Sequence, residues 1–167
     1  MQSNETINTG IECLRGLAVS FCRDINFDAL LSGEIMQRYK ESPAEAMVDI
    51  CDGLHVGPEL FTEAQWEDVF SECMGPVLCC LKNGNWVCVL KAEEAIAEKE
   101  QIAIFDPLSE GQSKIIQVKL EQFKLNWGGQ AIRFNNLFIK DDGTNTALFC
   151  LASVGKHHGV DIDMRRL

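Results

Sequence analysis

Apolar residues recur at helical spacing in the first part of the chain, which predicts that this part is built from amphipathic helices. The first helix should cover residues 10–22, with an apolar stripe formed by Leu14, Leu17, Ala18 and Phe21. Asn26 is placed to cap a second helix that runs to about Lys40. The spacing therefore predicts two helices before the first proline of the chain.

Two further helix starts follow. The run Ser42-Pro43-Ala44-Glu45 combines an N-cap serine, a first-turn proline and a glutamate that can close a capping box. This helix should end at Gly53. The run Thr62-Glu63-Ala64-Gln65 repeats the capping pattern ahead of a short apolar stripe of Trp66, Val69 and Phe70.

The pattern changes in the second half, where short apolar runs alternate with turn residues. Residues 76–81 and 86–90 flank Asn83-Gly84, which predicts a β-hairpin. Three more strands and a short helix or turn are predicted, together with a charged loop: strands 101–105, 113–118 and 130–134, helix 120–127 and loop 92–99. Helices first and an antiparallel sheet second indicate an α+β fold with two layers around one core.

Charge narrows the range of partners. The formal net charge is −10, which disfavours a nucleic-acid partner because phosphate binding needs clustered Lys and Arg. An acidic surface can instead attract a basic polypeptide segment. No run approaches the roughly 20 apolar residues of a membrane span, and no signal peptide is evident. The composition predicts a soluble globular domain.

The eight cysteines fit a reducing compartment better than a disulfide scaffold, because three of them lie inside strand-like apolar runs: Cys79, Cys80 and Cys88. No Cys-x-x-Cys pair occurs, so we expect no structural zinc, no other metal site and no cofactor.

The order and spacing of the motifs resemble the papain-like peptidase domain of bacteriocin exporters, which are double-glycine leader peptidases. The resemblance is closer to the inactive, peptidase-like domain at the N-terminus of ABC transporters that secrete RTX toxins and adhesins by type I secretion. It covers about residues 5–135. Its landmarks are Thr9-Gly10, Gly75-Pro76-Val77-Leu78, Asn83-Gly84-Asn85-Trp86, Ile104-Phe105-Asp106-Pro107 and the stretch 123–129.

The resemblance implies a papain-like cysteine peptidase fold whose catalytic positions have changed. The nucleophilic cysteine position holds Thr9, and the general-base histidine position holds Trp86, whose indole nitrogen cannot accept a proton. Asp106 occupies the position of the aspartate that orients the histidine. The glutamine that helps to bind the oxyanion falls at Ser3, with Gln2 one residue away.

The resemblance further implies a non-catalytic domain on the cytoplasmic side of the bacterial inner membrane. Such a domain would bind unfolded protein cargo before export and would contact the membrane and ATPase domains of the exporter. A shallow groove at the former active site would bind the peptide, with contacts from Trp86, Asn85, Thr9, Asp106 and Trp127.

Three other interpretations stay open. The chain could be an active leader peptidase that uses Cys13, which lies four residues past the nucleophile position. It could be a structural assembly module of the transporter that binds no cargo. Each site residue also has a plain structural interpretation: Thr9 as a helix-start residue, Trp86 as a hairpin core residue and Asp106 as a turn former. His55, at the start of a short strand, is expected to be an ordinary surface residue.

The end of the chain repeats its beginning. Asn145-Thr146-Ala147-Leu148-Phe149-Cys150-Leu151 echoes residues 8–14 at a constant offset of 137 residues. We therefore expect a degenerate peptidase-like domain over 1–135. Residues 136–167 would be a linker and the first helix of a second copy, through which two chains could form a homodimer.

Overall fold

The computed structural model describes residues 8–21, 26–71, 76–91 and 101–135. The expected loop over 92–99 and the expected second copy over 136–167 lie outside these residues. Within them the order of elements is helical first and then mostly β, as predicted: α1 Thr9–Phe21, α2 Phe27–Leu30, α3 Gly33–Glu41, α4 Pro43–Gly53, β1 Pro58–Phe61, α5 Trp66–Phe70, β2 Val77–Leu81, β3 Trp86–Lys91, β4 Gln101–Phe105, β5 Ile115–Lys119, α6 Leu120–Asn126 and β6 Trp127–Phe134.

The strands form one antiparallel sheet in the order β1-β6-β2-β3-β4-β5. The predicted hairpin is its centre, with Val77 paired to Val89 and Cys80 paired to Trp86. Gly84 has a φ of +86° in the connecting turn, which explains why glycine follows Asn83 there. The α+β class with N-terminal helices on an antiparallel sheet is thus confirmed.

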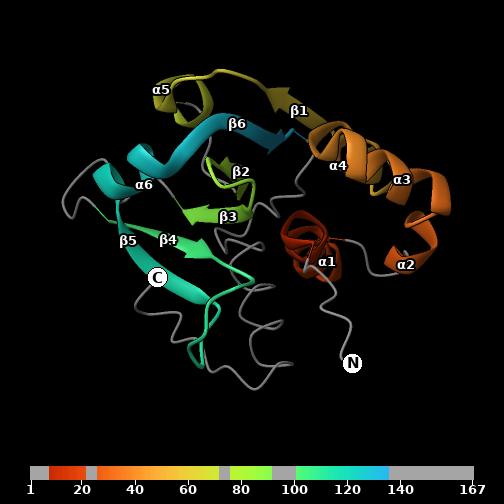
Figure 1. Ribbon diagram of the computed structural model, residues 1–167, viewed down its shortest axis with the longest axis horizontal. Coiled ribbons are helices and arrows are strands. Elements are labelled where there is room, and N and C mark those ends of the chain that lie inside the picture. The colour runs from red at the N-terminus through yellow and green to blue at the C-terminus, as the bar shows by residue number, and fades with distance from the viewer. Residues whose placement is uncertain (1–7, 22–25, 72–75, 92–100, 136–167) are drawn as a thin grey trace, which may run out of the picture.

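The sheet is covered on both faces, so the expectation of two layers around one core is wrong. Figure 1 shows α1 to α4 gathered on one side of the sheet and α5 and α6 on the other. Side chains alternate along each central strand, so that Leu78 and Cys88 pack in one cluster with α1 and α4. Val77 and Val87 pack in a second cluster with α5 and α6. The fold therefore has two hydrophobic cores separated by the sheet.

Several helices begin or end at residues other than those predicted, because local hydrogen bonds determine where they stop. The helix expected from Asn26 to Lys40 is two helices, because Ser32 starts a new one: its Oγ accepts the Ile35 N–H at 3.2 Å. Ser42 forms no side-chain cap, and its N–H instead closes α3 by donating to the Arg38 carbonyl at 2.7 Å.

The capping pattern expected at Thr62 lies three residues further on. Gln65 is the N-cap of α5, and its N–H donates to the Asp68 carboxylate at 2.8 Å. His55 is exposed in a turn with a φ of +59°, and the strand that follows begins only at Pro58.

Gly10 marks the closest approach of α1 to the helices beside it. A Cβ at Gly10 would overlap Met47 Sδ, and it would lie 2.8 Å from the Tyr39 hydroxyl and 3.3 Å from Trp86 Cδ1. These three side chains are buried, so there is no free volume into which a methyl group could move them. The first turn of α1 can therefore pack closely against the core because Gly10 has no side chain.

We expect Gly10→Ala to lower the free energy of unfolding by about 1–3 kcal/mol, because it overpacks this contact. Gly33→Ala is the matched control, since Gly33 also begins a helix and a Cβ there would meet nothing within 4 Å. That variant should be neutral or stabilising by up to about 1 kcal/mol. Urea unfolding of both variants checks the prediction, and equal stability of the two would contradict it.

Candidate functional site

The main chain of Trp86 forms hydrogen bonds that join α1 to the sheet. Its backbone N–H donates to Thr9 Oγ1 at 2.8 Å, and its carbonyl accepts the Cys13 thiol at 3.6 Å. Thr9 and Cys13 are four residues apart, so they lie one above the other on the same face of α1. Pairing between β3 and β4 starts at Cys88, and the two α1 side chains therefore satisfy main-chain groups beyond the end of that ladder.

This arrangement is closed to solvent. Trp86 is 2% exposed, Thr9 4% and Cys13 1%. The indole packs in the cluster shared with α1, α3 and α4. We expected Trp86 to line an open groove and to offer aromatic surface to a peptide; the structure instead buries it.

Tyr39 fills the space beside the start of α1. Its hydroxyl lies next to the Gly10 backbone, and its side chain is buried. Burial raises the pKa of Tyr39, while hydrogen bonding to the backbone of Gly10 and Ile11 partly offsets that rise. The first-turn amides of a helix are favourable sites for developing negative charge, and here the phenol already occupies that place.

Asp106 serves the turn that ends β4. Its Oδ1 accepts the Leu108 N–H at 2.9 Å, and its own N–H donates to the Lys114 carbonyl at 2.8 Å. It is half-buried and close enough for its charge to raise the pKa of Cys13. Asp106 thus acts locally as an Asx-turn residue.

The two remaining predicted binding residues are Asn85 and Trp127. Asn85 is half-buried in the hairpin turn beside Trp86, and its N–H donates to Asn83 Oδ1 at 3.0 Å. Trp127 is the first residue of β6 and packs in the cluster on the opposite face, with its Nε1–H donated to the Gln130 carbonyl at 3.0 Å. The structure brings together Thr9 and Trp86, and the expectation that Trp127 is their neighbour is wrong, because Trp127 packs in the other cluster. Ser3 and Gln2 lie outside the described residues.

Cys13 is poorly suited to act as a nucleophile. Burial raises its pKa well above the usual value, and the nearby Cys88 and Asp106 raise it further. The thiol also donates a hydrogen bond to the Trp86 carbonyl. Within the described residues the single histidine is His55, which is exposed in a turn. Among the described residues, Cys13 is thus buried and has no histidine beside it.

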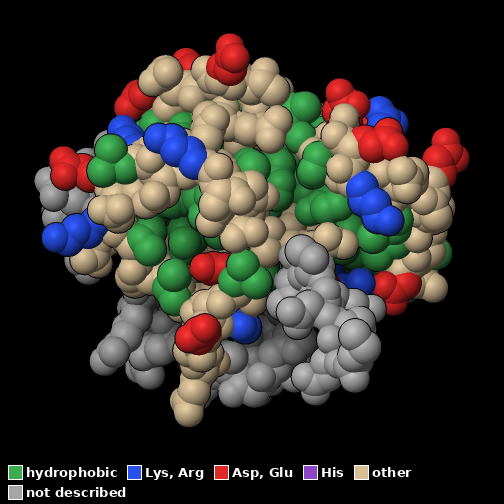
Figure 2. Space-filling view, in the orientation of Figure 1, with side chains coloured by type: hydrophobic (Ala, Val, Ile, Leu, Met, Phe, Trp, Pro, Cys, Tyr) green, Lys and Arg blue, Asp and Glu red, His purple; other side chains and the backbone are tan. Residues whose placement is uncertain are grey.

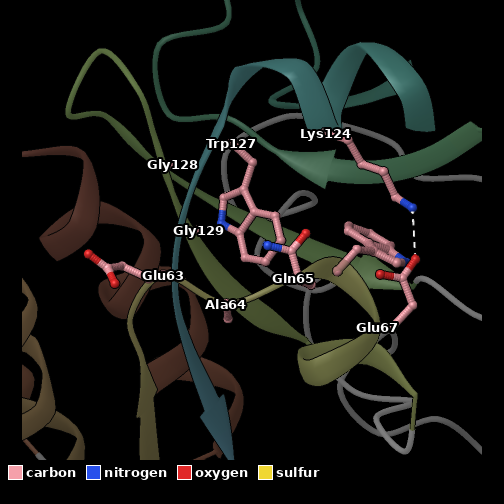
Figure 3. A pocket seen from close by; sticks show the side chains of 9 residues that line it. Glu63, Ala64, Gln65, Glu67, Lys124, Trp127, Gly128 and Gly129 are labelled. Atoms are coloured by element: carbon pink, nitrogen blue, oxygen red, sulfur yellow. Dashed lines mark hydrogen bonds and ion pairs between the residues drawn. The ribbon is translucent and has the colours of Figure 1, made fainter.

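A pocket that the sequence analysis missed lies on the other face, between α5, α6 and the start of β6. Its volume is about 410 Å³, and its walls come from residues 63–67, Lys124 and residues 127–129. Figure 3 shows Lys124 reaching from α6 toward Glu67, with Gln65 and Trp127 beside the opening. Gly128-Gly129 directly after an aromatic residue was the available sequence signal, because paired glycines in a strand often mark a bulge.

Metal and membrane sites are not evident in the part of the chain that the structure describes. No group of three or more His, Cys, Asp or Glu side chains is arranged there to hold a metal ion. Among the same residues, no helix has the length and apolar character required to span a bilayer.

Solved structures that are similar to this chain include a protease from a transporter and the peptidase domain of ComA. One is a double-glycine-motif protease from an AMS/PCAT transporter in complex with the leader peptide; identity is 14%, the TM-score is 0.44, and 55% of this chain and 58% of that chain are covered. Two others are the peptidase domain of Streptococcus mutans ComA. The ComA structure with a small-molecule inhibitor has 20% identity and a TM-score of 0.43, with 55% and 73% of the two chains covered.

The second structure of that ComA domain gives 18% identity and a TM-score of 0.42, over 55% of this chain and 73% of that chain. This chain thus spans about 58% of the protease–leader peptide structure. No protein-family model and no curated protein matches the sequence.

Thr9→Val should lower the free energy of unfolding by about 1–3 kcal/mol, because it keeps the shape of the side chain but leaves the buried Trp86 N–H without an acceptor. Thr9→Ser, which retains the hydroxyl, should lose clearly less. Urea unfolding of the two variants beside the wild type checks this. A Thr9→Val protein as stable as Thr9→Ser would show that the hydrogen bond contributes little.

Proposed function

We propose that this chain is a non-catalytic, polypeptide-binding domain of a bacterial type I secretion ABC exporter, which holds unfolded protein cargo before export. In this role it faces the cytoplasm and contacts the membrane and ATPase domains of the exporter. The observation that carries the proposal is the Thr9–Trp86 contact. At the two positions where the resemblance places nucleophile and base, the chain has a hydrogen bond inside its core.

The chemistry of these residues supports the absence of catalysis. A threonine hydroxyl attacks a carbonyl only when a base removes its proton, and the indole at the base position cannot do so because the lone pair of its nitrogen is part of the aromatic π system. The Thr9 hydroxyl oxygen is already the acceptor of a main-chain N–H, and the Tyr39 hydroxyl lies beside the next residue, Gly10. Thr9 is also 4% exposed, which supports a structural and not a nucleophilic role for this oxygen.

The surface supports polypeptide binding by charge. The chain has 25 acidic and 15 basic side chains. On the face shown in Figure 2, acidic side chains lie mostly along the margins, while apolar side chains reach the surface between them. Such a surface attracts basic, unfolded segments at low ionic strength and repels nucleic acid.

We expect the domain to bind a basic unfolded polypeptide without cleaving it. Fluorescence anisotropy of labelled, reduced and carboxamidomethylated ribonuclease A, titrated with the domain, should show saturable binding that weakens several-fold on raising salt from about 0.05 to 0.5 M. Folded ribonuclease A is the control for unfolded-state recognition. Mass spectrometry of the same mixture should recover the probe intact.

Two outcomes would contradict this proposal in different ways. Cleavage of the probe that disappears in a Cys13→Ala variant would establish a thiol peptidase. No binding of the unfolded probe at any salt concentration would favour an assembly module that contacts only the neighbouring domains of the transporter.

A further inference from the structure

The sheet ends in two unlike edge strands. β1 forms one edge and β5 the other, and Figure 1 shows β5 on the outer side of β4. β1 begins with Pro58, which has no N–H to donate, and its Glu59 is paired with Arg133 at 2.7 Å. β5 contains no proline and pairs with β4 over all five of its residues without a bulge. Within the described residues β5 has a neighbouring strand on one side only, so its other side is a template for a further strand.

Hydrogen bonds at the start of β5 show which of its main-chain groups point away from β4. The Asp106 N–H donates to the Lys114 carbonyl at 2.8 Å, so these two facing residues form a hydrogen-bonded pair. Because such pairs alternate along an antiparallel ladder, the N–H and C=O groups of the odd-numbered residues of β5 point outward. The Ser113 hydroxyl agrees with this at Ile115, since its Oγ accepts the Ile115 N–H at 3.1 Å and donates to the Ile115 carbonyl at 2.9 Å.

Gln117, in the middle of β5, has main-chain groups that no described residue uses. Its side chain is exposed, and its outward N–H and C=O have no partner among the residues that the structure describes. The other two outward positions differ from it. Ser113 bonds the groups of Ile115, and Lys119 is the N-cap of α6, so its carbonyl turns into that helix. An added strand would therefore pair first with Gln117, at the centre of the edge.

A second copy of β5 is complementary to this edge. When two β5 strands pair antiparallel about a two-fold axis at Gln117, all five residues are paired, and the two Gln117 residues exchange N–H···O=C hydrogen bonds. Ile116 then faces the second copy's Val118, and both of these half-buried side chains already pack on the cluster with α5 and α6. Lys119 faces the second copy's Ile115, so no like charges lie opposite one another. Any other register leaves part of β5 unpaired.

From these features we infer that the β5 edge joins two copies of this chain into a dimer with one continuous sheet. The inference goes beyond the proposed function and does not depend on it. It places the interface at β5 and not at the segment 136–167. One short strand from each copy makes a small contact, so the dimer is weak and forms at high protein concentration. Because each copy has a net charge of −10, the dimer should become tighter as salt is raised, unlike the binding of a basic polypeptide.

The test places charges on the two-fold axis. Sedimentation velocity of the full chain, over a series of protein concentrations, should show a reversible equilibrium between monomer and dimer. Gln117→Glu and Gln117→Lys each place two like charges opposite one another, and each variant alone should dimerise several-fold more weakly than the wild type. An equimolar mixture of the two variants brings opposite charges together and should form a dimer at least as tight as that of the wild type.

Gln112→Glu and Gln112→Lys are the matched controls. Gln112 is exposed in the turn before β5, so these variants change the net charge by the same amounts but away from the axis, and both should dimerise as the wild type does. Circular dichroism checks that each variant is folded.

Two results would overturn the inference. One is a wild type that stays monomeric at every concentration. The other is a dimer that both Gln117 variants form as readily as the wild type, because its interface must then lie elsewhere. Binding of unfolded ribonuclease A is a separate measurement, so either result leaves the proposed function standing.

Discussion

The arrangement of this domain depends on two hydrogen bonds to a single residue. Thr9 and Cys13, one turn apart on α1, accept from and donate to the main chain of Trp86 at the start of β3. That contact sets how deeply α1 lies on the sheet, and the missing side chain of Gly10 allows Tyr39, Met47 and Trp86 to close around it. Because a buried main-chain group without a partner is costly, the position is held by polar as well as apolar contacts.

The same contact lies at the two positions where the resemblance places catalytic residues. In the peptidases that it resembles, the start of the first helix and the start of this strand carry the nucleophile and the base. Here those positions form part of the core, and Asp106 accepts a hydrogen bond within its own turn. The pocket lined by Trp66 lies on the opposite side of the sheet, where α5, α6 and the glycine bulge form its walls.

Local signals in the sequence predicted most elements but not the layers. The hairpin follows from the apolar runs around Asn83-Gly84, and these depend on neighbours in the chain. Trp127 was misplaced because nothing local states which face of the sheet a residue after a short helix will join. The burial of Trp86 likewise depends on Gly10 and Met47, each distant from it in sequence. Ser32 divided an expected helix because a serine cap competes locally with a continuous apolar stripe.

Hydrogen exchange at the Trp86 amide tests the central claim most directly, because that N–H is satisfied by a side chain and not by a strand. If Thr9 is a structural acceptor in a closed core, this amide should exchange as slowly as the paired amides of β2 and β3. In Thr9→Val its protection should fall while theirs stays largely unchanged. A Trp86 amide that exchanges in the wild type as fast as an exposed loop amide would mean that the Thr9–Trp86 contact is open to solvent.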